Sequence, residues 1–225
     1  MNFLSKLSFG FLGVIFFAAV CAPWITSHSY ETQDTLNTLA TPSFSHLMGT
    51  DRLGRDLFSR LIYGARVSLF IGVFTTLLAL IVGTIYGSIS GYVGGRIDGF
   101  MMRVVDVIFA LPDMLMIILI TVMMGRGVLG MFVALTLVSW VTVARLVRGE
   151  VLRIKEKTYV EAARALGASS PRILIQDILP NILGLMVVTL TFRIPAAILA
   201  ESTLSFIGLG VAPPFSSWGT MANEG

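Results

Sequence analysis

Long apolar runs constrain this chain more than any other feature of its sequence. Five runs reach the length of a membrane-crossing helix, about 20 residues, and they cover residues 7–25, 67–92, 107–125, 128–144 and 182–200. Hydrophobic residues make up 55% of the chain and charged residues only 13%, whereas an ordinary soluble domain has about 25% charged residues. Unpaired backbone groups are costly in lipid, so the sequence predicts an all-α, polytopic transmembrane helix bundle with five spans.

Composition and motifs exclude several classes of protein. A net charge of +3 is too small to indicate a nucleic-acid partner. Cys21 is the only cysteine, so no disulfide can form within the chain. The sequence contains no G-x-x-x-x-G-K phosphate loop and no nucleophile elbow, so we expect neither enzyme activity nor a cofactor. His28 and His46 lie far apart in sequence, and we expect surface residues there rather than metal ligands.

The polar stretch between the fourth and fifth runs is predicted to be two helices joined at a glycine. Helix-forming residues end at Gly167, which can adopt the left-handed conformation that closes a helix. Ser170 and Pro171 then predict an N-cap and the first position of the next helix. The first helix carries small or charged side chains, at Glu161, Ala162, Ala163, Arg164 and Ala165. So little bulk lets another protein approach the backbone closely, and we interpret this stretch as a docking site.

The same stretch reads Glu-Ala-Ala, three residues, Gly, nine residues, then Asp177, one further residue, Leu and Pro. It resembles the cytoplasmic signature loop of the permease subunits of binding-protein-dependent ABC importers, and departs from it at Asp177, where the family has an aliphatic residue. The resemblance implies that the short helix docks in a groove of a separate ATPase subunit and transmits its motion. The coupling residues implied are Glu161, Ala162, Ala163, Arg164, Gly167 and Pro180. The alternative is an ordinary positively charged loop that only sets the topology.

Two further stretches resemble one branch of this family. Residues 49–69 carry alternating charges and glycines, and residues 201–219 begin with Glu-Ser-Thr and continue to glycines, prolines and a tryptophan. Both resemble the importers of dipeptides, oligopeptides and nickel, in their second, C-type permease. For residues 49–69 a solvated, ion-paired linker is the alternative. A sixth helix follows in that branch, whereas this sequence stops at Gly225, so we expect the sixth span to be missing and the chain to be a fragment or a truncated product.

The distribution of charge predicts the topology. Basic residues gather between the fourth and fifth runs, which the positive-inside rule places in the cytoplasm. Four crossings then put the N-terminus in the cytoplasm too. The first run is expected to be an uncleaved helix rather than a signal peptide, because Pro23 follows the candidate cleavage position Ala22. The expected domains are residues 1–27, an N-terminal transmembrane helix; 28–66, an extracytoplasmic loop; and 67–225, the permease domain, incomplete at its C-terminus, with a cytoplasmic coupling loop at 149–180.

Small residues recur at every fourth position of the second run, including Gly83, Gly87 and Gly91. Such a stripe lets two helix backbones approach closely in lipid. The alternative is that glycine and alanine are simply common in membrane helices. The stripe predicts tight packing of this helix, but the sequence does not name its partner.

Ionisable residues inside the apolar runs are the remaining candidates. We expect Asp106 at the membrane interface beside Arg103, and Asp113 about 10 Å deeper along the same helix. Arg193 lies near the middle of the fifth run. Asp113 and Arg193 are candidates for a substrate path. The alternatives are an interhelical hydrogen bond for Asp113, and for Arg193 a structural pair with Asp113 or Glu201.

The resemblance therefore implies the passive half of an ATP-driven importer in the bacterial inner membrane. The partners it implies are a homologous permease subunit in a heterodimer, two cytoplasmic ABC ATPase subunits and an extracytoplasmic substrate-binding protein. Peptides are the favoured substrates, with nickel or another small solute as the alternative. An ion-coupled secondary transporter and a truncated non-transporting subunit also stay open as functions. Internal repeats with broken helices would favour the secondary transporter, and the sequence shows none.

Overall fold

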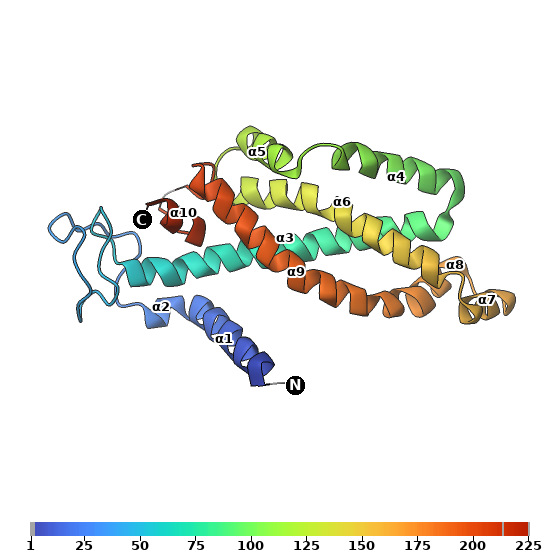
Figure 1. Cartoon of the computed structure of the whole chain (residues 1–225), viewed down its shortest axis with the longest axis horizontal. Helices are drawn as coiled ribbons and strands as arrows, with labels where there is room; N and C mark the ends of the chain where they lie inside the picture. Colours follow the sequence, from blue (N-terminus) through green and yellow to red (C-terminus); the bar gives the residue numbers. More distant parts are fainter. Residues whose placement is uncertain (1–2, 213, 225) are drawn as a thin grey trace. The chain divides into compact units, whose positions relative to one another are not determined.

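The computed structural model describes residues 3–212 and 214–224, which fold mainly into helices (Figure 1). In chain order these are α1 Phe3–Val20, α2 Ala22–Ile25, α3 Leu57–Val93, α4 Gly95–Phe109, α5 Asp113–Met124, α6 Val128–Ile154, α7 Thr158–Ala165, α8 Ser170–Arg172, the π-helix η1 Ile173–Ile178, α9 Leu179–Phe206 and α10 Trp218–Glu224. Within the described ranges, the extended pairing is limited to an isolated bridge between Thr50 and Asp56. The prediction of an all-α membrane bundle is confirmed.

Three helices in the described part of the chain are long and apolar enough to cross a membrane. They are Leu57–Val93, Val128–Ile154 and the continuous helix Ser170–Phe206, which joins α8, η1 and α9. The helices α4 and α5, bent by 83° against each other, make a fourth span if the pair is counted as one. The first expected span corresponds to α1, which is apolar but shorter, and to the single turn of α2 beyond Cys21.

The run expected at 107–125 is not one straight helix. The helix α4 ends at Phe109, and α5 begins at Asp113. Pro112 explains the break, because proline lacks a backbone N–H and disfavours helical geometry in the residue before it. Asp113 therefore lies in the first turn of α5, and its side chain is exposed. The expectation of a buried carboxylate deep within a continuous helix is wrong.

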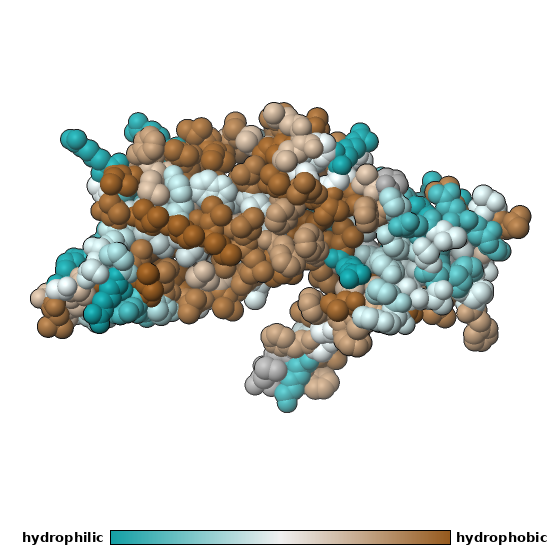
Figure 2. All heavy atoms as spheres, turned by 180° about the vertical axis from the view of Figure 1, so that it is seen from behind, coloured by the Kyte–Doolittle hydropathy of each residue, from teal (hydrophilic) through white to brown (hydrophobic). Residues whose placement is uncertain are grey.

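Apolar side chains cover most of the helix surface visible in Figure 2, whereas hydrophilic side chains gather over the loop between α2 and α3. The helix Ser170–Phe206 is the clearest case, because only 11% of its most apolar segment is buried. Val187 and Phe192 on this helix are 59% and 74% exposed. Lipid tails or the apolar face of another membrane subunit can cover such a surface without loss of hydrogen bonds.

The chain divides into two compact units. The first holds the described residues of 1–72, 121–131 and 198–225, and the second holds 73–120 and 132–197.

Buried charges hold the first unit together. Arg55 and Arg60 are only 8% and 2% exposed. Arg55 donates from Nε to Asp51 Oδ2 at 2.7 Å and from Nη2 to Glu224 Oε2 at 2.9 Å, and Arg60 pairs with the same two carboxylates. Burial raises the pKa of Asp51. Hydrogen bonds from the backbone and the side chain of Arg55 lower it by more, so the pKa lies below its ordinary value. Two cations thus face two anions, so the alternative of a solvated linker is wrong.

Glu201 joins the end of α9 to α3 in the same unit, and it is fully buried. Its carboxylate accepts hydrogen bonds from the hydroxyls of Ser68 at 3.0 Å and Ser205 at 2.7 Å. The Ser68 hydroxyl in turn accepts from the backbone N–H of Trp218 at 3.2 Å. The two stretches that resemble the importer branch are therefore bonded to each other.

In the second unit, α3 and α6 approach each other closely at glycines. A methyl group at Gly83 would lie 2.7 Å from the carbonyl oxygen of Trp140. One at Gly87 would collide with the carbonyl oxygen of Ala144, and one at Gly91 would lie 2.9 Å from a carbonyl oxygen of α6. Real Cβ atoms do not approach backbone oxygens so closely. The partner of the glycine stripe is therefore α6, and only glycine at these positions admits it.

Candidate functional site

The candidate site is the corner formed by α7, α8 and the turn between them. Gly167 has a φ of +82°, which closes α7 in the left-handed region. Its N–H donates to the carbonyl of Arg164 at 3.0 Å, and the N–H of Ala168 donates to the carbonyl of Ala163 at 3.0 Å. This pair of bonds is the Schellman motif, which satisfies the last carbonyls of a helix and favours glycine at this position. The glycine break between two helices is where the sequence predicted it.

The second helix of the corner begins and winds differently from the expectation. Ser169, not Ser170, is the N-cap residue, and its side chain makes no capping hydrogen bond. Further on, Pro180 lacks an N–H, and its ring crowds the carbonyl four residues earlier. The π-helix η1 ends just before this proline, and at its end the N–H of Leu179 bonds to the carbonyl of Leu174. The pattern of apolar residues carried no signal for this wider turn.

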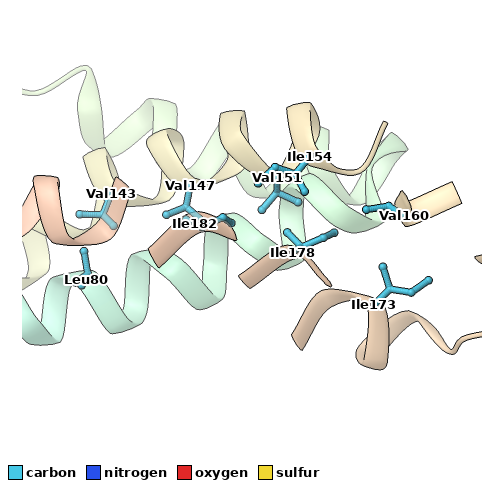
Figure 3. Close-up of a cluster of buried hydrophobic side chains, with 9 residues drawn as sticks. All are labelled: Leu80, Val143, Val147, Val151, Ile154, Val160, Ile173, Ile178 and Ile182. Carbon is cyan, nitrogen blue, oxygen red and sulfur yellow. The ribbon is translucent and has the colours of Figure 1, made fainter. Parts of the chain in front are cut away.

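A buried apolar cluster fastens the corner to the long helices of the second unit (Figure 3). Its members come from α3, α6, α7, η1 and α9: Leu80, Val143, Val147, Val151, Ile154, Val160, Ile173, Ile178 and Ile182. Figure 3 shows Ile178 and Ile182 pointing toward side chains of α6, and Ile173 pointing toward Val160 of α7. Burying each such side chain contributes about 1.5–3 kcal/mol. The corner therefore cannot separate from α6 and α9 without a large loss of stability, and a force on it acts on both helices.

The outer face of the corner is exposed and polar. Glu161, Ala162, Arg164 and Gly167 are exposed, and Leu166 is 89% exposed beside them. Ala163 is half-buried and packs against the apolar cluster. Pro180 is also exposed but lies on α9, beyond the π-helix. The structure thus leaves four of the six predicted coupling residues exposed at the corner, with the large apolar side chain of Leu166 available to a partner.

An ion pair that sequence reasoning missed links α4 to α6. Asp98 is 9% exposed, and Arg148 donates to it from Nε and Nη2, both at 2.6 Å. The hydroxyl of Ser90 donates to the same carboxylate at 2.5 Å. Residues 94–98 resemble a turn in sequence, but α4 begins at Gly95. If residues 94–98 had been predicted as helix, the spacing of seven residues would have put Asp98 on the same face of α4 as the apolar Val105.

Asp106 has a different partner from the one expected. It forms an ion pair with Arg145 of α6, and the guanidinium carbon of Arg145 lies 3.9 Å from the centre of the Phe109 ring. Arg103, the expected neighbour, is exposed. Both ion pairs therefore bind α4 to α6, the helix that leads to the corner.

The two candidate path residues lie in the second unit. Arg193 is half-buried near the middle of α9, and Asp113 is exposed at the start of α5. Within residues 3–212 and 214–224, no ion pair within 4.0 Å links them. The alternative of a direct structural pair between them is not found in this structure.

Comparison with known proteins finds a matching family and several similar proteins whose names agree with that family. The family of "binding-protein-dependent transport system inner membrane component" matches residues 83–225. The dipeptide transport system permease protein DppC of Bacillus subtilis is 47% identical over 224 residues, which is 100% of this chain and 70% of the relative. The oligopeptide transport system permease protein OppC of the same organism is 44% identical, covering 100% of this chain and 73% of the relative. The glutathione transport system permease protein GsiD of Salmonella typhimurium is 44% identical, covering 96% and 71%.

Proposed function

The chain belongs to the family of binding-protein-dependent transport system inner membrane components, and from this premise we propose that the corner at α7 and α8 couples it to an ATPase subunit. As a permease subunit of the peptide branch of ABC importers, the chain is a multi-pass protein of the inner membrane. Hydrolysis of ATP then takes place on separate ATPase subunits, and this chain supplies half of the membrane path.

One observation carries the coupling proposal: the corner is exposed and polar outside but apolar and fully packed inside. Glu161 and Arg164 face outward, whereas Val160 of the same helix is fully buried. A partner that grips the outer face would push on a rigid element, because the inner face is part of the core between α6 and α9. Movement of the ATPase would thus become movement of two membrane helices.

The proposed substrates are dipeptides or oligopeptides. Two relatives that align over the whole chain are named as permeases for dipeptides and oligopeptides, and a third as a permease for glutathione, which is itself a small peptide. Nickel or another small solute is the alternative substrate.

The proposed assembly is a heterodimer with a homologous permease, bound by two ATPase subunits and an extracytoplasmic binding protein. The exposed apolar face of α9 supports a second membrane subunit, since packing rather than hydrophobicity drives helix association in lipid. The N-terminus and residues 149–180 lie in the cytoplasm in this arrangement, residues 28–66 lie outside, and residues 67–225 form the permease domain. Gly83, Gly87 and Gly91 pack α3 on α6, which supports the corner.

Replacing Gly167 with Val tests the coupling proposal. A left-handed conformation costs an L-residue about 1–2 kcal/mol, and a β-branched side chain is among the least tolerant, so α7 should end differently. We expect binding of co-expressed ABC ATPase subunits to weaken about tenfold, measured as ATPase retained per permease on co-purification. Gly149→Val is the control, because an added Cβ atom there meets open space at an ordinary φ. Undiminished ATPase binding by the Gly167 variant, at an unchanged melting temperature, would count against the docking surface.

Reversing the charge of Arg193 tests its proposed place on the substrate path. If its guanidinium attracts peptide carboxylates with a charge-assisted hydrogen bond of about 1.5–3 kcal/mol, Arg193→Glu should reduce peptide uptake tenfold or more. Uptake is measured in proteoliposomes that contain the complete importer, and assembly is measured by co-purification. Loss of uptake in a complex that still assembles supports the path. A complex that fails to assemble shows a structural role instead.

A further inference from the structure

Two histidines and an aspartate meet in the loop between α2 and α3. His28, His46 and Asp56 each offer a ligand atom, and these three atoms lie within 4.8 Å of one another. The two imidazole rings are 4.7 Å apart between centroids and tilted by 34°. His46 Nδ1 lies 2.9 Å from Asp56 Oδ1. His28 is exposed and His46 half-buried, as expected for surface residues, but the fold of this loop brings the two side chains together.

The spacing of these atoms fits a small metal ion. In a tetrahedral zinc site with bonds of about 2.0–2.1 Å, two ligand atoms lie about 3.3 Å apart. The pair His46 Nδ1 and Asp56 Oδ1 is already within a few tenths of an ångström of that separation. His28 is exposed, and its Nδ1 lies 3.1 Å from the hydroxyl of Ser27, a contact that a rotation of the side chain toward the ion would replace. Such a rotation of His28 would bring a third ligand atom to the ion that His46 and Asp56 hold.

The surroundings of the cluster fix the carboxylate of Asp56 in place and leave one side of the cluster open to a pocket. Asp56 is 4% exposed, and its second oxygen accepts the N–H of Ser59 at 2.8 Å, which fixes the carboxylate at the start of α3. Such a second bond orients a metal ligand. The cluster opens into a pocket that Asp34 and Thr32 also line. Water can therefore complete the coordination sphere from the pocket.

We propose that His28, His46 and Asp56 bind a divalent transition-metal ion of the zinc class. Two imidazole nitrogens with one carboxylate suit Zn²⁺, Ni²⁺ or Cu²⁺, whereas Mg²⁺ and Ca²⁺ prefer oxygen ligands alone. The ion links the beginning of the loop, its middle and the residue that directly precedes α3, so it holds the loop closed on that helix. This site lies outside the coupling corner, and it does not depend on the proposed function.

A zinc titration of the full chain in detergent, purified through a tag that contains no histidine, tests the site. Affinity is measured by competition with a chromophoric chelator, and stability by the melting temperature with and without Zn²⁺. We expect Zn²⁺ to bind and raise the melting temperature, and Mg²⁺ to do neither. His28→Gln should weaken Zn²⁺ binding at least tenfold, because even outer contacts of a metal site contribute about 10–100-fold in affinity.

The control is Glu31→Gln, which removes a carboxylate from the same loop but outside the cluster. Each variant is compared with its own metal-free melting temperature, so a change in folding stability does not imitate a loss of binding. The site is refuted if the wild type does not bind Zn²⁺, or if His28→Gln binds it as tightly as the wild type. An equal loss in Glu31→Gln would also refute it, since the binding would then be diffuse.

Discussion

Gly87→Leu is expected to prevent stable packing of α3 on α6. Even the first carbon of the new side chain would collide with the carbonyl oxygen of Ala144, and it would lie 3.0 Å from the backbone nitrogen of Arg148. Backbone atoms inside a helix cannot move aside as a flexible side chain can, so the two helices must separate. Overpacking costs about 1–3 kcal/mol and occasionally more, and we expect about 3 kcal/mol or more of unfolding free energy to be lost here.

Thermal unfolding in detergent and the yield of monodisperse protein measure this effect. The matched control is Gly99→Leu in α4, where an added Cβ atom would meet no atom within 4 Å. Leucine is also a better helix former than glycine, so this control should melt no lower than the wild type. Equal melting temperatures for the two variants would show that α3 and α6 do not approach each other at Gly87.

The second large effect is expected from Arg148→Met. Methionine keeps the apolar stem of the arginine but leaves the buried Asp98 without its cation. Removing one partner of a buried ion pair destabilises a protein by about 3–5 kcal/mol. The Arg148 side chain is 32% exposed and that of Asp98 13%, so we expect the lower end, about 3 kcal/mol. The loss would appear as a lower melting temperature in detergent.

Arg153→Met on the same helix is the matched control. Arg153 pairs with Glu150, but its side chain is 61% exposed, and such surface pairs contribute about 0–1 kcal/mol. A double variant, Arg148→Met with Asp98→Asn, should recover part of the lost stability, since it removes the unpaired charge. If Arg148→Met melts like Arg153→Met, or if the double variant recovers nothing, Asp98 is not a buried charge that depends on Arg148.

Both variants act on the support of the candidate coupling site. Gly87 and Asp98 hold α3 and α4 against α6, and Lys155 at the end of α6 donates to the carbonyl of Gly91 at 2.9 Å. The same end of α6 supplies Val151 and Ile154 to the cluster beneath α7. A defect in this packing should therefore weaken the transmission of movement even where the exposed face of α7 is unchanged.

Local signals predicted the helices and the corner well. The break at Gly167 follows from a glycine after helix-forming residues, and the bonds that close α7 join residues at most five positions apart. The membrane class follows from apolar runs alone, because lipid allows few backbone structures. Pro112 and Pro180 are local signals of the same kind, since each disturbs the helix next to it. The unbroken hydropathy around Pro112 nevertheless favoured one straight span there.

Partners far apart in sequence could not be predicted. Asp98 and Arg148 are separated by 50 positions, and Arg55 and Glu224 by 169. A charged residue in a sequence shows that a partner is needed, but several opposite charges were available for each. The meeting of His28 and His46 could not be predicted for the same reason, although the fold brings their rings into contact.

The sequence by itself determined that this chain is helical and lies in a membrane, that its helices break at Gly167, and that it resembles importer permeases. Hydropathy, proline and glycine act through the backbone next to them, so these properties are written in short stretches. Only the tertiary structure decided that α6 receives the glycines of α3, that Arg148 neutralises Asp98, and that α7 has one buried and one exposed face. These depend on which helices meet, and that is settled by close packing of the whole chain rather than by any one segment.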